Sequence, residues 1–248
     1  MIEIQELWKS FGTQEVLRGT SLRVQTGEFL ALVGMSGSGK SILLKHIVRL
    51  IEPDRGRVWV DGQEVTALSR HELERLRSRV GYVFQSGALF DSMTVFDNVA
   101  FPLREKTRLS PSAIRDRVMR ELEQVGLKNA ENKYPAHLSG GMLKRVALAR
   151  TLAQDPEIVL FDEPTTGLDP IVSNSILELF DSVHQRLKLT GILVSHDIPE
   201  IFGIVQKVAL LHEGKIVSVD TPEAIQHSPN PIVDQFIHGK PHGPIPYR

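Results

Sequence analysis

The feature that most constrains the fold of this chain is a glycine-rich loop between a short apolar run and an amphipathic segment. Residues 34–41 read GMSGSGKS and fit the pattern G-x-x-x-x-G-K-[ST], and the run 27–34 before them (GEFLALVG) is apolar. The residues that recur at helical spacing after the loop are Ile42, Leu43, His46, Ile47 and Leu50. This order predicts a strand, a loop and a helix, and it disfavours the alternative of a flexible linker.

The residue types in this loop predict how it would hold a phosphate. Glycine allows backbone amides to wrap around phosphate oxygens, a lysine can reach the β- and γ-phosphates, and a hydroxyl can bind Mg²⁺. Ser41 is therefore a candidate Mg²⁺ ligand. The candidate phosphate-binding residues are Gly34, Met35, Ser36, Gly37, Ser38, Gly39 and Lys40.

Two further apolar runs end in polar residues, as buried parallel strands do where their carboxyl ends meet a ligand. They are PEIVLFDE, which ends at Glu163, and TGILVSHD, which contains His196. The first run would bring Asp162 to a metal-bound water and Glu163 to the water that attacks a phosphate. The second would bring His196 to the γ-phosphate. We expect all these polar ends to share one site.

A fourth candidate, Gln85, follows the apolar run GYVF and would contact both Mg²⁺ and the attacking water. Taken alone, Gln85 or His196 is better explained as an ordinary polar residue at a strand end. The pair Asp162 and Glu163 alone would suit a solvated loop. The glycine-rich loop upstream favours the catalytic interpretation of all four.

The rest of the chain predicts an α/β protein with additional antiparallel strands. Residues 57–65 (RVWVDGQEV) and 207–219 (KVALLHEGKIVSV) each contain an X-Gly pair that suits a tight hairpin. Helical patterns dominate between 86 and 155, whereas the Pro- and Gly-rich end, 228–248, predicts an extended tail. One apolar helical stripe is formed by Ile114, Val118, Leu122 and Val125.

Composition excludes several functional classes. The 248 residues contain no cysteine, so there is no disulfide, thiolate metal site or cysteine nucleophile. A formal net charge of -1 disfavours nucleic acid as a main partner. The polar start of the sequence does not suggest a targeting peptide, and no apolar stretch approaches the roughly 18 residues of a membrane span.

A second glycine pair stands at the start of a predicted helix, in HLSGGMLKRVALAR (137–150). Ser139 and the amides of Gly140 and Gly141 would offer hydrogen-bond donors to an anion. Six motifs in this order resemble those of the ATP-binding cassette (ABC) ATPases. They are residues 34–41, Gln85, LSGG (138–141), FDEP (161–164), GLD (167–169) and His196.

The resemblance covers nearly the whole chain and implies a P-loop NTPase fold. It would have a core with a mixed parallel sheet, an antiparallel β subdomain and a helical subdomain at about 86–155. Residues 1–241 would form the ATPase domain and 242–248 a tail. Members of this family bind ATP and Mg²⁺, and the resemblance implies that Phe11 stacks on adenine. It also implies that four residues act on the ATP held by the partner subunit: Ser139, Gly140, Gly141 and Asp169. The implied assembly is a homodimer. As a lone aromatic, Phe11 could instead be a core residue.

Within the family, the run FQSGALFDSMTVFDNV (84–99) followed by FPLRE (101–105) resembles the Mla subgroup. These ATPases power phospholipid movement between inner and outer membranes and maintain outer-membrane lipid asymmetry. The resemblance implies a peripheral location on the cytoplasmic face of the inner membrane. A permease would insert a coupling helix near the Gln85 loop, with an MCE-domain lipid-binding subunit and a small STAS-domain protein as further partners. Residues 244–248 would reach the other ATPase subunit, although a bare sequence suggests a frayed end.

The sequence departs from the family pattern at two places and leaves two other functions open. Met142 stands where glutamine is usual, and Thr166-Gly167 where Ser-Ala is frequent. One alternative function is the ATPase of another importer, for polar amino acids or a different MCE-linked substrate. The other is an ATP-dependent dimerisation switch without transport.

Overall fold

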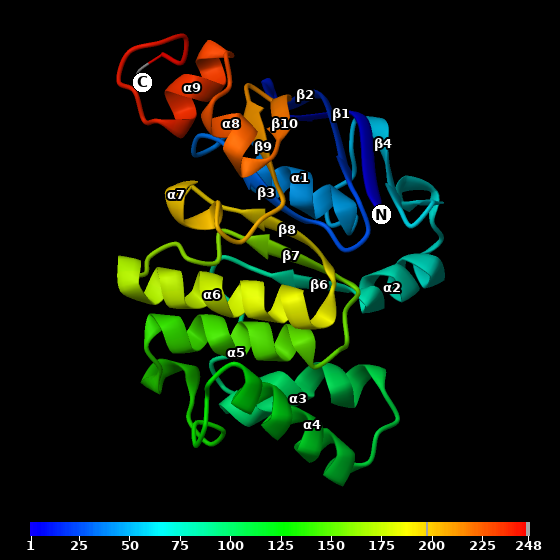
Figure 1. The fold of residues 1–248 in the computed structure, drawn as a ribbon. Helices are drawn as coiled ribbons and strands as arrows, with labels where there is room; N and C mark the ends of the chain where they lie inside the picture. The colour runs from blue at the N-terminus through cyan, green and yellow to red at the C-terminus, as the bar shows by residue number, and fades with distance from the viewer. Residues whose placement is uncertain (197, 247–248) are drawn as a thin grey trace.

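The computed structural model describes residues 1–196 and 198–246, which form two β-sheets with helices packed against them (Figure 1). The strands are β1 (Ile2–Phe11), β2 (Gln14–Val24), β3 (Phe29–Val33), β4 (Arg55–Val60), β5 (Gln63–Glu64), β6 (Val80–Val83), β7 (Ile158–Asp162), β8 (Thr190–Val194), β9 (Lys207–His212) and β10 (Lys215–Asp220). One sheet is antiparallel, in the order β2-β1-β4-β5. The other runs β10-β9-β3-β8-β7-β6, and only its β10–β9 pair is antiparallel.

Most of the helices begin at a residue whose side chain caps the first turn. The helices are α1 (Lys40–Ile47), α2 (Arg70–Arg79), α3 (Val95–Lys106), α4 (Pro111–Gln124), α5 (Gly140–Leu152), α6 (Pro170–Leu187), α7 (Ile198–Ile201), α8 (Pro222–Gln226) and α9 (Pro231–Ile237), with short 3₁₀ turns at Val65–Ala67 and Pro135–His137. In α4, α6, α8 and α9, proline follows the capping residue and suits the first turn because its missing N–H needs no partner there. The four capping residues are Ser110, Asp169, Thr221 and Asn230.

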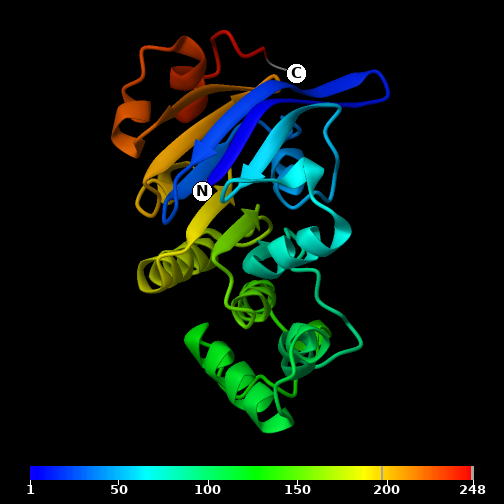
Figure 2. The same ribbon diagram turned by 90° about the vertical axis from the view of Figure 1, so that its right-hand side faces the viewer.

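The six-stranded sheet has a hydrophobic core on each face, because alternate residues of a strand point to opposite sides. In β3, Phe29, Ala31 and Val33 pack with residues of α5 and α6, whereas Leu30 and Leu32 pack with α1 and the antiparallel sheet. In both views α3 and α4 lie at the opposite end of the molecule from the β1–β2 hairpin (Figures 1 and 2). The predicted fold class, a mixed parallel sheet with an antiparallel β subdomain and helices, is confirmed.

The two predicted hairpins are confirmed. Asp61 and Gly62 join β4 to β5, and Glu213 and Gly214 join β9 to β10. All four have positive φ, from 46° to 77°, as a type I′ turn requires at both central positions. A third hairpin, β1–β2, is not evident from the sequence.

The prediction of an extended segment over 228–248 is wrong for part of it. Residues 231–237 form helix α9, because Asn230 accepts a hydrogen bond from the backbone N–H of Ile232 at 3.0 Å and Pro231 occupies the first turn. After the helix the chain folds back: the Gln235 side chain donates to the Ile245 carbonyl at 3.1 Å and accepts from the Ile245 N–H at 2.7 Å. Residues 247 and 248 lie outside the described residues, so the proposed dimer contact of the tail stays a prediction.

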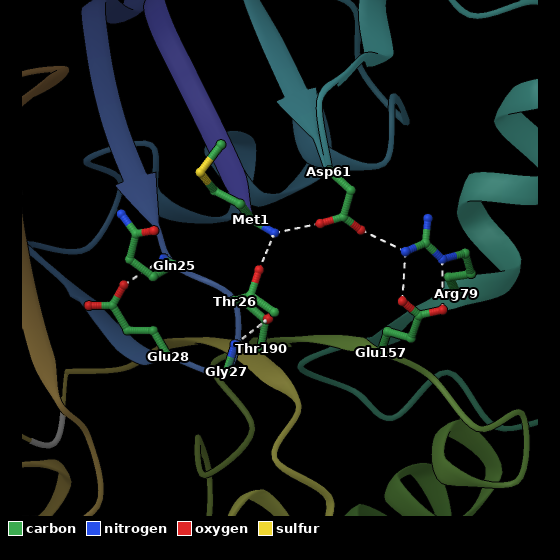
Figure 3. A network of polar contacts seen from close by, with 9 residues as sticks. All are labelled: Met1, Gln25, Thr26, Gly27, Glu28, Asp61, Arg79, Glu157 and Thr190. Carbon is green, nitrogen blue, oxygen red and sulfur yellow. Dashed lines mark hydrogen bonds and ion pairs between the residues drawn. The ribbon is translucent and has the colours of Figure 1, made fainter.

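A polar network ties the two sheets together at the edge where strands β6, β7 and β8 begin (Figure 3). Arg79 donates two hydrogen bonds to the Glu157 carboxylate, at 2.8 and 2.6 Å, and one to Asp61 at 2.6 Å. The amino nitrogen of Met1 contacts the other Asp61 oxygen at 2.5 Å. Arg79 therefore joins the start of the parallel strands to the β4–β5 turn. No helix in the described part of the chain is both long and apolar enough to cross a membrane.

We expect Arg79→Ala to lower the free energy of unfolding by about 1 kcal/mol, the range of a partly exposed ion-pair network. The hydrogen bond from Arg79 lowers the pKa of Glu157 in the folded state. This contribution is therefore complete above the ordinary glutamate pKa of about 4.3 and is lost as the pH falls through the folded-state pKa. Urea unfolding at about pH 7 and about pH 3 measures both effects. Arg79→Lys, which cannot form the paired hydrogen bonds, is the control and should lose part of the stability.

Candidate functional site: a nucleotide site at the carboxyl ends of the parallel strands

The glycine-rich loop between β3 and α1 adopts backbone conformations that only glycine accepts readily. Gly34 has φ 154°, and a Cβ there would lie 2.3 Å from the Leu211 carbonyl oxygen. Gly39 is the N-cap of α1, with φ 103° and no side-chain cap. The first N–H groups of α1 therefore have no N-cap side chain as acceptor, and a helix start of this kind binds anions.

Lys40 is a buried cation held by the loop that it follows. It is 4% exposed, and its Nζ donates to the carbonyl oxygens of Gly34 at 2.9 Å and Met35 at 3.0 Å. The same Nζ lies 3.7 Å from Glu163 Oε1. Burial lowers the pKa of Lys40, while the charges of Glu163 and Asp162 act in the opposite direction. An arriving phosphate would meet a lysine that is already positioned.

We expect Lys40→Ala to weaken ATP binding by about 10- to 100-fold, because a hydrogen bond to a charged group contributes about 1.5–3 kcal/mol. Titration with a fluorescent ATP analogue measures the dissociation constant. Lys45→Ala, at the other end of α1, is the matched control and should leave it unchanged. Equal affinities for the wild type and Lys40→Ala would contradict the assignment of Lys40 to the phosphate.

Two oxygen-bearing side chains that the sequence assigns to Mg²⁺ lie side by side. The Ser41 hydroxyl donates to Asp162 Oδ1 at 2.5 Å, and Asp162 is 5% exposed at the end of β7. No cluster of three or more His, Cys, Asp or Glu residues within 1–196 and 198–246 could hold a metal ion. A serine hydroxyl and one carboxylate suit Mg²⁺, which takes its remaining ligands from phosphate and water.

The predicted catalytic residues converge on the Glu163 carboxylate. Glu163 Oε2 accepts a hydrogen bond from Thr166 at 3.2 Å, lies 3.5 Å from Gln85 Nε2 and 3.9 Å from His196 Nδ1. Glu163 itself has φ 47°, a strained conformation for a non-glycine residue and one that is common at functional sites. The structure thus brings together Gln85, Glu163 and His196, which follow strands far apart in the sequence.

These residues border a cavity of about 830 Å³ that also includes the glycine-rich loop and helix α9. The lining residues are Gly34, Met35, Ser36, Lys40, Gln85, Glu163, Thr166, His196, Ile198, Pro199, Phe236, Ile237, His238 and Gly239. The part formed by α9 was not anticipated, since the sequence was interpreted there as an extended tail.

Phe11 stands at the end of β1 and is 47% exposed, so it is not a core residue. It lines a smaller cavity, of about 260 Å³, together with Gly37, Gly39, Lys40 and Ser41 of the glycine-rich loop. An exposed ring beside a phosphate-binding loop is placed to contact a base.

The second glycine pair belongs to a different surface. Ser139 caps α5 by accepting from the Met142 N–H at 3.4 Å, and Asp169 caps α6 by accepting from the Val172 N–H at 3.0 Å. A Cβ on Gly141 would lie 2.6 Å from Val172 Cγ1, so the two helix starts are in contact. Among the described residues that line the cavities around 34–41, none is Ser139, Gly140, Gly141 or Asp169.

Two basic residues of α5 hold the loop that carries Gln85. Lys144, 7% exposed, donates to the Gln85 carbonyl oxygen, and Arg150 donates to the carbonyl oxygens of Gly87 and Ala88, both at 2.7 Å. Burial lowers the pKa of both side chains. The sequence pattern does not predict these contacts. Lys144 lies on the same helical stripe as Ala147, Leu148 and Thr151. Because lysine is rarely buried without a partner, this position could have indicated a buried contact.

Comparisons with known proteins agree with this geometry. A family model described as ABC transporter matches residues 17–166. The intermembrane phospholipid transport system ATP-binding protein MlaF of Escherichia coli K12 is 41% identical over 248 residues, which cover 100% of this chain and 92% of that protein. The probable ribonucleotide transport ATP-binding protein mkl of Mycobacterium leprae is 40% identical over 244 residues, which cover 98% of this chain and 70% of that protein.

Among solved structures, the dimeric post-hydrolysis state of the ATP-binding cassette MJ0796 bound to ADP and Pi superposes with a TM-score of 0.82. It is 32% identical, and the match covers 90% of this chain and 99% of that one. Since a family model matches more than half of the chain and the similarity extends along its length, the chain belongs to the ABC transporter family, as an ATP-binding subunit that hydrolyses ATP to drive transport.

Proposed function

We propose that two copies of the chain bind two ATP molecules between them, each held by the glycine-rich loop of one copy and the 139–141 loop of the other. The observation that carries this proposal is the separation of the two half-sites. The cavities around residues 34–41 do not include Ser139, Gly140, Gly141 or Asp169 among the described residues. The N–H groups at the start of α5 that Ser139 does not cap are available to an acceptor from outside the chain. The dimeric state of the MJ0796 cassette supports the same assembly.

Within one such site, each residue is assigned a separate role in hydrolysis. Loop amides and Lys40 would bind the phosphates, and Phe11 would contact the base. Glu163 would accept a proton from the attacking water, while Gln85 orients that water and His196 contacts the γ-phosphate. Ser41, Asp162 and Gln85 would hold Mg²⁺, which neutralises charge on the phosphate oxygens when it is bound.

We further propose that the transported substrate is a phospholipid, moved between inner and outer membranes so that outer-membrane lipid asymmetry is maintained. Support comes from similarity to MlaF over the full length of this chain and 92% of that protein. The mkl relative is almost as similar in identity, but the match covers only 70% of its length. A ribonucleotide is therefore the competing substrate, and a polar amino acid or another MCE-linked substrate is a further alternative.

The partners follow from the same proposal. A permease would dock its coupling helix beside the Gln85 loop, where Phe90 is exposed and packs against Phe101 with ring centroids 5.0 Å apart. An MCE-domain lipid-binding subunit and a small STAS-domain protein would complete the complex. The ATPase would then lie on the cytoplasmic face of the inner membrane.

Reconstitution of the assembled complex tests the substrate. The chain is purified with the membrane subunits that it retains, and the complex is placed in proteoliposomes with fluorescent phospholipid. We expect ATP-dependent phospholipid movement that is lost in the Glu163→Gln complex, and phospholipid among the molecules that co-purify. Uptake of labelled ribonucleotide without phospholipid movement would contradict the lipid assignment and leave the ATPase intact.

A further inference from the structure

Tyr82 contacts the carboxylate that the preceding section assigns to Mg²⁺. Its phenol donates to Asp162 Oδ2 at 2.9 Å, while the Ser41 hydroxyl donates to Asp162 Oδ1 at 2.5 Å. Each oxygen of this buried carboxylate therefore has its own hydroxyl donor, one from β6 and one from α1. Neither the family resemblance nor the sequence pattern assigns a role to Tyr82.

The position of Tyr82 is fixed by the sheet and by a neighbouring ring. Strands β6 and β7 pair in parallel with Tyr82 opposite Leu160, two residues before Asp162. The Tyr82 ring stacks on Phe84, with centroids 4.2 Å apart and an interplanar angle of 30°.

We propose that Tyr82 is a positioning residue for Mg²⁺ that acts through Asp162. By holding Oδ2, the phenol stops the carboxylate from rotating and keeps Oδ1 directed to the Ser41 side, where the metal would bind. This inference rests on the proposed Mg²⁺ role of Ser41 and Asp162. Partners that orient a metal ligand typically contribute 10- to 100-fold to metal affinity.

The test is Tyr82→Phe, which removes one oxygen and keeps the ring that stacks on Phe84. Mn²⁺ replaces Mg²⁺ as the probe, and electron paramagnetic resonance measures free Mn²⁺ in the presence of a non-hydrolysable ATP analogue. We expect Mn²⁺ to bind about 10-fold more weakly. The Mg²⁺ concentration for half-maximal ATPase activity should rise by a similar factor, while ATP binding in EDTA stays unchanged.

Tyr134→Phe is the matched control, because Tyr134 lies in an exposed segment between α4 and α5 and loses the same atom. It should leave Mn²⁺ affinity at the wild-type value. Unchanged Mn²⁺ affinity in Tyr82→Phe, with or without a loss of thermal stability, would overturn the inference.

Two further variants separate failure of this inference from failure of the metal assignment. If Asp162→Asn and Ser41→Ala weaken Mn²⁺ binding while Tyr82→Phe does not, only the role of Tyr82 is wrong. If none of the three changes Mn²⁺ affinity, the metal assignment and the role of Tyr82 fall together.

Discussion

Glu163→Gln should abolish steady-state ATP hydrolysis, with a loss of at least about 100-fold, while ATP still binds. The amide cannot accept the proton of the attacking water, and a general base contributes about 10²- to 10⁴-fold to the rate. Lys40, Ser41 and Asp162 remain in place, so the phosphate contacts are retained. With ATP and Mg²⁺ the variant should accumulate as a closed dimer, because the γ-phosphate proposed to bridge the two copies is not removed.

Phosphate release and light scattering coupled to size exclusion measure the two effects. Glu178→Gln, which neutralises an exposed carboxylate on α6, is the matched control and should hydrolyse ATP at the wild-type rate. A Glu163→Gln sample that remains monomeric with ATP and Mg²⁺, even beside its membrane partners, would contradict the bridging role of ATP.

Ser139→Arg should block ATP hydrolysis and leave ATP binding by the isolated, monomeric chain unchanged. Ser139 is exposed at the start of α5 and does not line the cavities around the glycine-rich loop, so its replacement leaves the chain's own loop intact. In a dimer, the arginine would occupy the position proposed for the partner's γ-phosphate. ATP titration and phosphate release measure the two properties.

The control for Ser139→Arg must account for the lost helix cap, which costs about 0.5–2 kcal/mol. Ser110 caps α4 with nearly the same geometry, accepting from the Ala113 N–H at 3.3 Å. Ser110→Arg should lose similar stability and keep its turnover. Wild-type turnover in Ser139→Arg would show that the active site is complete within one copy.

The parts of the fold that sequence analysis predicted are those with local signals. Apolar runs that end in Gly34, Glu163 and His196 identify buried parallel strands, and Asp61-Gly62 identifies a hairpin. The β1–β2 hairpin was not predicted, because Glu6, with φ 45°, interrupts the pairing register between Ile4 and Leu7. This break hides the alternation of apolar and polar residues that is typical of a strand.

Helix α9 was not predicted for a different reason. The Pro- and Gly-rich composition of 228–248 predicts an extended tail, although Pro231 directly after Asn230 is a favourable first residue of a helix. The meaning of proline depends on its position relative to the cap, and a composition-based interpretation of the tail ignores position.

Sequence patterns identify candidate site residues where side-chain chemistry is distinctive, as for Lys40, Asp162 and Glu163, which the structure places close together. Tyr82 and Lys144 were missed because their partners are distant in sequence: Asp162 is 80 residues from Tyr82, and the Gln85 carbonyl is 59 residues from Lys144. A tyrosine in a strand and a lysine in a helix have no local pattern that announces such a contact. Only the three-dimensional arrangement pairs them.

Helix α5 contacts the Gln85 loop through the main chain of that loop. Lys144 and Arg150 hold main-chain oxygens, which every amino acid supplies, whereas the side chains of Ser86 and Ala88 are exposed. The side chain at position 86 can therefore change without loss of these contacts, whereas the φ of 47° at Ala88 restricts the residues that suit position 88. The contact between α5 and the Gln85 loop is independent of the side chain at position 86, which lies in the loop proposed to meet the permease.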